Sequence, residues 1–292
     1  MVFAVIGGDL RQLKLAEALC RDGHEVRVFA LGNLPADTEM MRTGSVRDAV
    51  NAADCVVLPL PPVKEGKLNA PLDARLYDTN YLLTELETAR GAYIFAGGAD
   101  EGFKLEAERH GIRFLDYFAR EDLTIMNAAA TAEGAVMTLL GRTGKTLLGA
   151  RCLIVGYGRI GKLLAPRLAS FGAKLTISAR APSDRAWIRA YGWEAAETSK
   201  LAPMLGSFDV IINTVPVRVI ECEALPADGT YLELASAPGG ASREAVLAAG
   251  MDYVAAPSLP GRIAPVSAGR YIRDTIYNIL SELGVDSDDF IK

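Results

Sequence analysis

Short apolar runs alternate with stretches of helical periodicity along most of the chain. In the first half, strands are expected at residues 2–6, 25–30, 55–59, 93–96 and 113–115, and helices at residues 10–21, 82–89 and 103–109. In the second half, strands are expected at residues 150–155, 174–180, 209–213, 230–234 and 253–256. Strands that alternate with helices form parallel sheets with helices on both faces. The pattern therefore predicts an α/β fold.

The chain is long enough for two such sheets. Its 292 residues exceed the size of one typical domain, and half of them are hydrophobic. A helical pattern over residues 127–140 is expected to connect the halves. We expect residues 1–126, with a returning C-terminal helix at residues 267–292, to form one domain, and residues 127–266 to form the other.

A GxGxxG sequence at residues 156–161 lies between an expected strand and an expected helix. In this context each glycine has a physical role. Gly156 allows a tight turn, Gly158 lets the backbone approach a pyrophosphate, and Gly161 lets the helix pack closely on the strand. Phosphates would then meet N–H groups at the positive end of the helix. The alternative is an ordinary glycine-rich turn between a strand and a helix.

The next expected strand ends in Ser178-Ala179-Arg180, and no acidic residue occurs between Gly161 and Ser183. Domains that bind NAD place a carboxylate near this point, on the ribose 2′-hydroxyl. A hydroxyl and a guanidinium would instead bind a 2′-phosphate. We therefore expect NADP(H) rather than NAD(H), with Ser178 and Arg180 on the phosphate and Arg185 as a helper. Alternatively, Arg180 is a solvated loop residue.

Later turns are expected at the same carboxyl edge of the second sheet, because they follow parallel strands of that sheet. Residues 214–216 follow one strand, and residues 235–240 follow the next. The residues expected to contact the cofactor are Gly156, Tyr157, Gly158, Arg159, Ile160, Gly161, Ser178, Ala179, Arg180, Thr214, Val215, Pro216 and Ala235.

Composition argues against several other classes of protein. The formal net charge of −5 does not favour a nucleic-acid surface. No uninterrupted apolar run approaches the ~20 residues of a membrane span, and the chain begins directly with a strand rather than a signal peptide. Four dispersed cysteines, Cys20, Cys55, Cys152 and Cys222, fit reduced thiols better than disulfides or a metal site.

The sequence has two histidines, His24 and His110, and both lie beside glycine in expected helix-to-strand turns. A 2-hydroxyacid dehydrogenase needs a histidine paired with a carboxylate beside the nicotinamide, so that reaction is not favoured. Shikimate-type dehydrogenases share an Asn-Thr-x-Pro turn but need a lysine in the first domain. Lys64 and Lys67 are candidates that no other motif supports.

Four dispersed segments, at residues 5–12, 131–134, 235–240 and 259–265, resemble the family of dipicolinate synthase A subunits of spore-forming bacteria. The resemblance spans nearly the whole chain, in the same order and spacing. It implies two Rossmann-like, doubly wound parallel-sheet domains flanking an interdomain cleft, as in formate/glycerate-dehydrogenase-like folds. It also implies NADP-dependent oxidation of dihydro- or 4-hydroxy-tetrahydrodipicolinate to dipicolinate (pyridine-2,6-dicarboxylate) during sporulation.

The resemblance further implies a partner, the flavin-type B subunit of dipicolinate synthase, and a cytoplasmic location in the mother cell of a sporulating bacterium. A homo-oligomer is expected, without nucleic acid, membrane or metal. Formation of an aromatic ring supplies much of the driving force, so the reaction needs little general-base strength.

Dehydration of a hydroxylated precursor would still require an acid or base, and Glu133 and Asp9 are the candidates. The two substrate carboxylates need cations or N–H donors. We expect Arg11 and Arg262 to bind them, and Thr131 and the backbone of Gly8 to assist. For each arginine, a surface or interdomain salt bridge is the alternative. For Thr131 and Glu133, the alternative is helix capping.

Two other functions remain open from the sequence. The chain could be a non-catalytic protein of a two-component enzyme, one that binds NADP(H) as a structural or sensing ligand while a partner performs the chemistry. It could also be a reductase of another small keto or imino acid. The shortage of obvious catalytic side chains favours the first of these.

Overall fold

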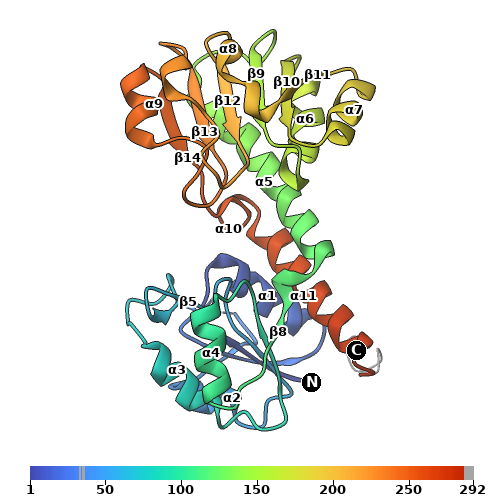
Figure 1. Cartoon of the computed structure of the whole chain (residues 1–292). Coiled ribbons are helices and arrows are strands. Elements are labelled where there is room, and N and C mark those ends of the chain that lie inside the picture. Colours follow the sequence, from blue (N-terminus) through green and yellow to red (C-terminus); the bar gives the residue numbers. More distant parts are fainter. Residues whose placement is uncertain (33, 35–36, 286–292) are drawn as a thin grey trace. The chain divides into compact units, whose positions relative to one another are not determined.

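The structure is a computed structural model that describes residues 1–32, 34 and 37–285 (Figure 1). The chain divides into two compact units. Unit 1 consists of Met1–Asn127 and Ala264–Lys292, and unit 2 consists of Ala128–Ile263. The expected returning helix at residues 267–292 begins at Pro265 and ends at Glu282, and residues 286–292 lie outside the described residues.

Unit 1 contains a parallel sheet of six strands in the order β3-β2-β1-β4-β7-β8, and a separate β5–β6 hairpin. The strands are β1 (Val2–Ile6), β2 (Glu25–Phe29), β3 (Met41–Arg42), β4 (Cys55–Val57), β5 (Val63–Lys64), β6 (Lys67–Leu68), β7 (Tyr93–Ala96) and β8 (Leu115–Asp116). The helices are α1 (Leu10–Arg21), α2 (Val46–Val50), α3 (Thr79–Leu86), α4 (Glu101–Arg109), a 3₁₀ turn η1 (Tyr117–Ala119) and α11 (Pro265–Glu282).

Alternate residues of β1 face opposite sides of the unit 1 sheet. Ala4 and Ile6 belong to the core formed with α2, α3 and α4. Phe3 and Val5 belong to the core formed with α1 and α11. The sheet is therefore buried on both faces, as the continuous apolar runs of its strands predict.

Unit 2 repeats this architecture with six parallel strands in the order β11-β10-β9-β12-β13-β14. The strands are β9 (Arg151–Val155), β10 (Lys174–Ala179), β11 (Glu194–Glu197), β12 (Val210–Asn213), β13 (Thr230–Glu233) and β14 (Asp252–Ala255). The helices are α6 (Arg159–Ser170), α7 (Pro182–Ala190), α8 (Ala202–Leu205), α9 (Arg243–Ala249), α10 (Leu259–Ile263) and the 3₁₀ turns η2 (Thr198–Lys200) and η3 (Cys222–Ala224).

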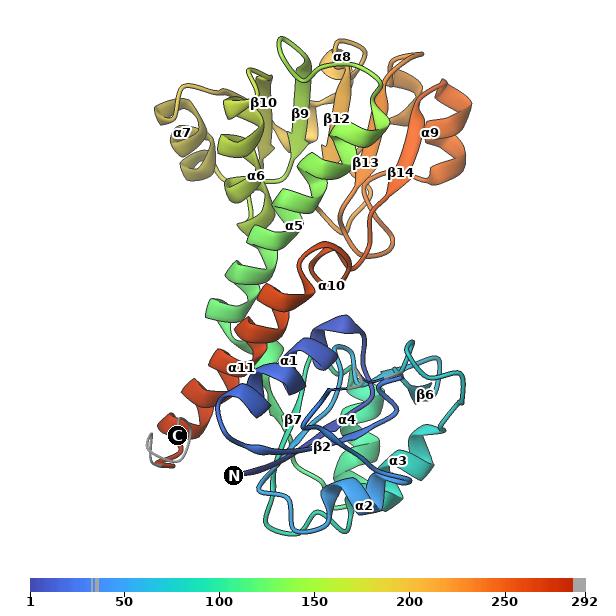
Figure 2. The ribbon, with the colours of Figure 1, turned by 180° about the vertical axis from the view of Figure 1, so that it is seen from behind.

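The two faces of the unit 2 sheet are also covered (Figure 2). Helices α5 (Glu121–Arg142), α6 and α7 pack on the face that contains Ile154 and Ile177. Helices α8 and α9 pack on the face that contains Leu153 and Ile211. In chain order the strands run 3-2-1-4-5-6, so the order reverses between β9 and β12. Ligands of such sheets bind at the carboxyl ends of the strands beside this reversal.

Helix α5 begins at Glu121, six residues before the expected connector, and crosses the boundary between the units. Glu121 and Asp122 occupy its first turn, where carboxylates stabilise the positive end of a helix. By length and composition α5 could cross a membrane, although the uninterrupted apolar runs in the sequence are short. Half of its most apolar stretch is buried in the protein, as is common for a core helix.

Helix α11 packs on α1 within unit 1. A Cβ atom at Gly269 would lie 2.6 Å from the backbone nitrogen of Leu15, so only glycine allows this approach. Arg273 bonds Asp22 at the end of α1, at 3.2 Å. The hydroxyl of Tyr277 donates to the same carboxylate at 2.8 Å.

Several expected boundaries were wrong. The strand expected at residues 113–115 is β8, at Leu115–Asp116, and the helix expected at residues 82–89 is α3, at Thr79–Leu86. The segment at residues 259–263, expected as a loop, forms the short helix α10. Helices α2, α7 and α9 were not expected, because each spans only five to nine residues, which is too short for a clear helical repeat in the sequence.

Candidate functional site

The glycine turn of unit 2 has the geometry that its sequence predicts. Gly156 has φ +102°, a left-handed conformation that favours glycine. A Cβ atom at Gly161 would lie 2.3 Å from the carbonyl oxygen of Gly156, so α6 packs directly on the turn. A Cβ atom at Gly158 would meet nothing within 4 Å. This last position faces open space, as an approaching phosphate requires.

Gly158 is the N-cap of α6, and the first helical hydrogen bond runs from the N–H of Lys162 to its carbonyl, at 2.9 Å. The N–H groups of Ile160 and Gly161 precede that bond and have no acceptor within the helix. Together with the helix dipole, such groups form an anion site. Tyr157 contributes only its backbone here, because its side chain is buried in the core beneath α6.

The loop after β12 is held against the glycine turn. The hydroxyl of Thr214 donates to the carbonyl of Val155 at 2.8 Å. A Cβ atom at Gly156 would lie 2.5 Å from that hydroxyl oxygen and 2.6 Å from a methyl carbon of Val215. Pro216 is exposed and Ala235 half-buried at the same carboxyl edge. The structure therefore brings these expected cofactor residues together around the first turn.

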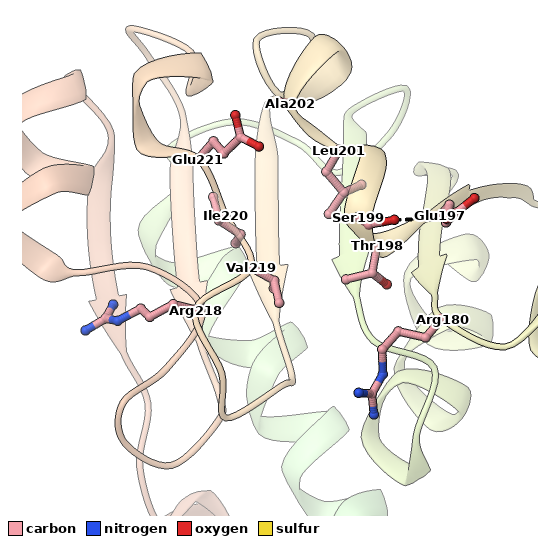
Figure 3. Close-up of a pocket in the computed structure, with 10 residues that line it drawn as sticks. All are labelled: Arg180, Glu197, Thr198, Ser199, Leu201, Ala202, Arg218, Val219, Ile220 and Glu221. Atoms are coloured by element: carbon pink, nitrogen blue, oxygen red, sulfur yellow. Dashed lines mark hydrogen bonds between the residues drawn. The ribbon is translucent and has the colours of Figure 1, made fainter.

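A cavity of about 490 Å³ lies between the carboxyl ends of β10 and β11 and the loop after β12 (Figure 3). Arg180 and Arg218 come from opposite sides of it, and Glu197, Thr198 and Glu221 also line it. Its position on the β10 side of the glycine turn is where the adenosine half of a dinucleotide binds in this topology. Neither Arg218 nor Glu197 was expected from the sequence, because each belongs to a loop or strand without a motif.

Arg180 and Ser178 differ in their exposure. Arg180 is exposed at the end of β10, where a 2′-phosphate would lie. Ser178 is fully buried, and its side-chain oxygen accepts a hydrogen bond from Thr198 at 3.3 Å. A buried hydroxyl cannot contact a ligand at the surface. We therefore do not retain the Ser178 side chain as a phosphate ligand.

Arg185 also has a role different from the one expected. Its guanidinium donates to the carbonyls of Ala179 (3.0 Å) and Arg180 (2.6 Å). These bonds fix the backbone at the end of β10. Arg185 thus orients the segment that carries Arg180, and its positive charge lies beside that segment.

Glu197 places a carboxylate in the same cavity. Its side chain accepts a hydrogen bond from Ser199 at 2.9 Å and forms an ion pair with Lys200 at 3.1 Å. The hydrogen bond from Lys200 lowers the pKa of Glu197 below its usual value. The charge of this carboxylate is therefore partly offset by a neighbouring cation.

The turn after β1 in unit 1 is closed to ligands. The N–H of Gly7 donates to the carbonyl of Phe29 at 2.7 Å, and that of Gly8 to the carbonyl of Asn69 at 2.8 Å. A Cβ atom at Gly8 would lie 2.5 Å from the side chain of Gln12. The glycines therefore make room for the protein's own side chains, and the backbone N–H of Gly8 is not available to substrate.

Asp9 and Arg11, expected as a proton-transfer group and a carboxylate ligand, bind each other. Asp9 is the N-cap of α1 and accepts hydrogen bonds from the backbone and guanidinium of Arg11 at 2.8–3.1 Å. The guanidinium also donates to the carbonyl of Leu60 at 3.3 Å. These bonds use Nε and Nη2, and leave Nη1 as the remaining donor among the described contacts.

The remaining expected substrate residues lie in unit 2. Thr131 and Glu133 are on α5, and Arg262 is on α10. The two helices touch, because a Cβ atom at Gly134 would lie 2.9 Å from Ile263. Glu133 forms an ion pair with Arg167 of α6 at 3.1 Å, and the side chain of Arg262 is exposed, with no hydrogen bond or ion pair among the described residues. Arg262 is therefore the better placed of the two expected arginines.

Both histidines have structural contacts. His24 is buried, and its ring bonds the hydroxyl of Tyr277 at 2.9 Å. His110 contacts the carboxylate of Glu87 at 2.7 Å. Within the part of the chain that the structure describes, no group of three or more His, Cys, Asp or Glu residues could hold a metal ion.

Comparison with known proteins finds matches for both units. Residues 2–118 match the N-terminal domain of the dipicolinate synthase A subunit, and residues 127–220 match the NAD binding domain of D-isomer specific 2-hydroxyacid dehydrogenases. The chain is 26% identical, over 96% of both chains, to the dipicolinate synthase A subunit of Bacillus subtilis (strain 168).

Solved structures agree with this match. The crystal structure of the dipicolinate synthase A subunit from Bacillus halodurans superposes with a TM-score of 0.86 at 27% identity, covering 96% of this chain and 97% of that one. The crystal structure of the corresponding protein from Bacillus subtilis gives a TM-score of 0.84 at 25% identity, covering 97% and 96%.

These findings confirm the expected resemblance and the expected fold of two parallel-sheet α/β domains. The NAD binding domain supports a nicotinamide dinucleotide as cofactor. The open space at Gly158 and the cavity beside Arg180 fit such a molecule. The chain therefore resembles dipicolinate synthase A subunits over nearly its whole length, and its second unit has an oxidoreductase-type domain of the kind that binds a nicotinamide dinucleotide.

Proposed function

We propose that the protein is an NADP-dependent oxidoreductase that forms dipicolinate from dihydrodipicolinate or 4-hydroxy-tetrahydrodipicolinate. The observation that carries this proposal is the match to the dipicolinate synthase A subunit over 96% of both chains, which includes the glycine turn. We further propose that it acts with the flavin-type B subunit, forms a homo-oligomer, and works in the cytoplasm of the mother cell of a sporulating bacterium.

The reaction needs the removal of two hydrogens from the dihydro compound. The glycine turn would hold a nicotinamide dinucleotide, which would supply the acceptor for one of them as hydride, while the second would leave nitrogen or carbon as a proton. Starting from the hydroxylated compound, loss of one water molecule comes first. Because the product ring is aromatic, the protein needs to orient the substrate more than to supply a strong base.

NADP rather than NAD is proposed from the end of β10. Arg180 is exposed there, no carboxylate lies on that strand, and Arg185 adds positive charge while holding the backbone. A guanidinium binds a 2′-phosphate with charge-assisted hydrogen bonds. Glu197 on the neighbouring strand opposes this attraction, but its ion pair with Lys200 offsets its charge.

Arg262 is the proposed principal ligand of a substrate carboxylate, because it is exposed and has no partner among the described residues. Arg11 offers a second, more constrained donor through Nη1. Glu133 remains the proposed proton-transfer residue, with its carboxylate oriented by the ion pair with Arg167. Asp9, which is occupied as a helix cap, is the weaker candidate.

The test is an assay of purified protein with NADP⁺ and enzymatically generated 4-hydroxy-tetrahydrodipicolinate. We expect NADPH absorbance to rise in step with dipicolinate. A rise only after addition of the B subunit would instead support a purely binding role for this chain. That alternative is favoured because Asp9 and Glu133 already form ion pairs within the chain. No rise under either condition would contradict the proposal.

Substitution of Arg262 tests the substrate site. Loss of a charge-assisted hydrogen bond costs roughly 1.5–3 kcal/mol, so Arg262→Ala should lower kcat/KM by about 10- to 100-fold. The matched control is Arg189→Ala, which removes an exposed arginine from α7. Unchanged kcat/KM in Arg262→Ala would remove this residue from the site.

A further inference from the structure

Glu233 is a buried carboxylate at the carboxyl end of β13, with a side chain that the proposed reaction does not use. It is 6% exposed. Its Oε1 accepts hydrogen bonds from Nδ2 of Asn213 (2.6 Å) and the N–H of Ala235 (3.0 Å). Its Oε2 accepts from the N–H of Gly240 (2.9 Å) and the hydroxyl of Tyr231 (3.2 Å). These five residues are called the Glu233 network below.

The network surrounds the carboxylate of Glu233 with hydrogen-bond donors. The side-chain amide of Asn213 and the two backbone N–H groups donate to it, and the hydroxyl of Tyr231, which can donate or accept, completes the set. No lysine or arginine bonds the carboxylate among the described residues, so its negative charge has no counter-ion in contact.

The same network shapes both loops at the β12 and β13 edge. Asn213 bonds Glu233 and also donates to the carbonyl of Val215 at 2.8 Å, while Val215 lies against Gly156. A Cβ atom at Gly239 would lie 2.6 Å from Oε2 of Glu233. Both loops therefore close around the carboxylate, and the first of them contacts the glycine turn.

The position of Glu233 in the sheet indicates which part of a dinucleotide it affects. The cavity beside Arg180, which would take the adenosine half, lies between the ends of β10 and β11 and the loop after β12. A dinucleotide that places its pyrophosphate at Gly158 extends its other half across the reversal of strand order, toward β12 and β13. The nicotinamide ring would therefore bind at the edge that the Glu233 network organises.

We propose that Glu233 makes unit 2 favour the oxidised dinucleotide, because its buried negative charge attracts the positively charged oxidised nicotinamide ring more than the neutral reduced ring. This inference rests on the proposed function. Glu233 does not touch the cofactor and acts as a positioning residue through Asn213 and Val215 and as a fixed charge. An enzyme that oxidises its substrate gains from this, because the oxidised cofactor binds well and the reduced product is released.

Glu233→Gln tests the charge. The carboxamide has nearly the same shape, but it removes the negative charge and turns two accepted hydrogen bonds into donor–donor contacts. Dissociation constants for NADP⁺ and NADPH would be measured by calorimetry on the full chain without substrate. We expect the ratio of NADP⁺ to NADPH affinity to fall by about 10-fold, as expected for one buried unit charge at moderate range. The control, Glu223→Gln, removes an exposed carboxylate of the same unit and should leave the ratio unchanged.

Tyr231→Phe tests the same charge in a variant that retains it. Removing one hydrogen-bond donor leaves the negative charge of the carboxylate less offset. The ratio of NADP⁺ to NADPH affinity should therefore rise about twofold. The inference is overturned if Glu233→Gln weakens the binding of both redox forms equally, because the charge then has no such role. It is also overturned if Glu233→Gln does not fold and Tyr231→Phe leaves the affinity ratio unchanged. If the wild-type chain binds neither NADP(H) nor NAD(H), the proposed function fails, and this inference with it.

Discussion

In each unit, the turn after the first strand leads to the corresponding helix. This turn is closed to ligands in unit 1 and open to them in unit 2. Each sheet has the same order of strands, and in each unit three residues lead from the first strand to the first helix. In unit 1 the N-cap is Asp9, whose carboxylate covers the positive end of α1. In unit 2 the N-cap is Gly158, which leaves the end of α6 open.

The comparison shows how little is needed to close an anion site. In unit 1 an internal carboxylate occupies the place that a phosphate would take, and Arg11 and Gln12 pack around it. In unit 2 the residue that corresponds to Gln12 is Gly161, which brings the helix onto the strand. One topology therefore yields a self-capped helix in unit 1 and a binding turn in unit 2. The residue at the N-cap decides between them.

The strongest test converts the second turn into the first. Gly158 has φ −82° and ψ −161°, an extended conformation that any residue adopts, so Gly158→Asp should fold and cap α6. Its carboxylate would occupy the pyrophosphate site and repel the pyrophosphate. We expect dinucleotide affinity to fall by at least ~100-fold, with an unchanged or higher melting temperature. Gly158→Ala is the control, and we expect it to lose less dinucleotide affinity. Equal losses of affinity in the two variants would contradict the electrostatic explanation.

The next test concerns the end of β10 in unit 2, where Arg180 is exposed. Arg180→Asp exchanges a guanidinium for a carboxylate beside the 2′ position. We expect NADPH affinity to fall by about 10- to 100-fold and NADH affinity to rise, because the carboxylate repels phosphate and binds a diol. Fluorescence titration with both cofactors measures the change. An unchanged preference between NADPH and NADH would show that the 2′ position of the ribose does not lie beside residue 180.

A third test opens the cap of unit 1. Asp9→Ala removes the N-cap of α1 and leaves the buried guanidinium of Arg11 without its carboxylate. We expect a loss of about 2 kcal/mol in the free energy of unfolding, measured by urea denaturation. Glu17→Ala, which breaks the partly exposed pair with Lys14 in the same helix, should cost about 0.5 kcal/mol or less. Equal costs would show that the cap contributes little.

The smallest expected effect is on the rates at which one buried thiol in each unit reacts with a labelling reagent. Burial raises the pKa of Cys55 in unit 1 and of Cys152 in unit 2 to about 12 each, so neither reacts in the native state at neutral pH. Labelling in mild urea therefore reports opening of each unit. With NADP⁺ at five times its Kd, labelling of Cys152 should slow about sixfold. Labelling of Cys55 should slow less, and the opposite order would place the ligand in unit 1.

Local backbone requirements could be predicted well from the sequence. The glycines of residues 156–161 are dictated by a turn, an open approach and a close helix contact, and all three are visible in the spacing. The repeated strands and helices followed from apolar periodicity for the same reason. Both kinds of signal are contained in a few neighbouring residues.

Contacts between distant residues could not be predicted in this way. Ser178 looked accessible at the end of its strand, but Thr198 covers it from η2, the turn after the next strand. Glu233 stands in an apolar run, and its partners Asn213 and Gly240 come from the end of β12 and from the loop after β13. Asp9 and Arg11 are only two residues apart, but they were expected to meet a ligand, because the sequence does not show that their side chains turn toward each other.

The packing of α11 on α1 has a consequence for synthesis of the chain. The outer layer of unit 1 is built from a helix near the start of the sequence and from the last described one, locked together at Gly269. Unit 2 is one continuous segment, whereas unit 1 needs residues 264–282 to complete this layer. We therefore expect unit 1 to reach its final form only after the whole of unit 2 has been synthesised.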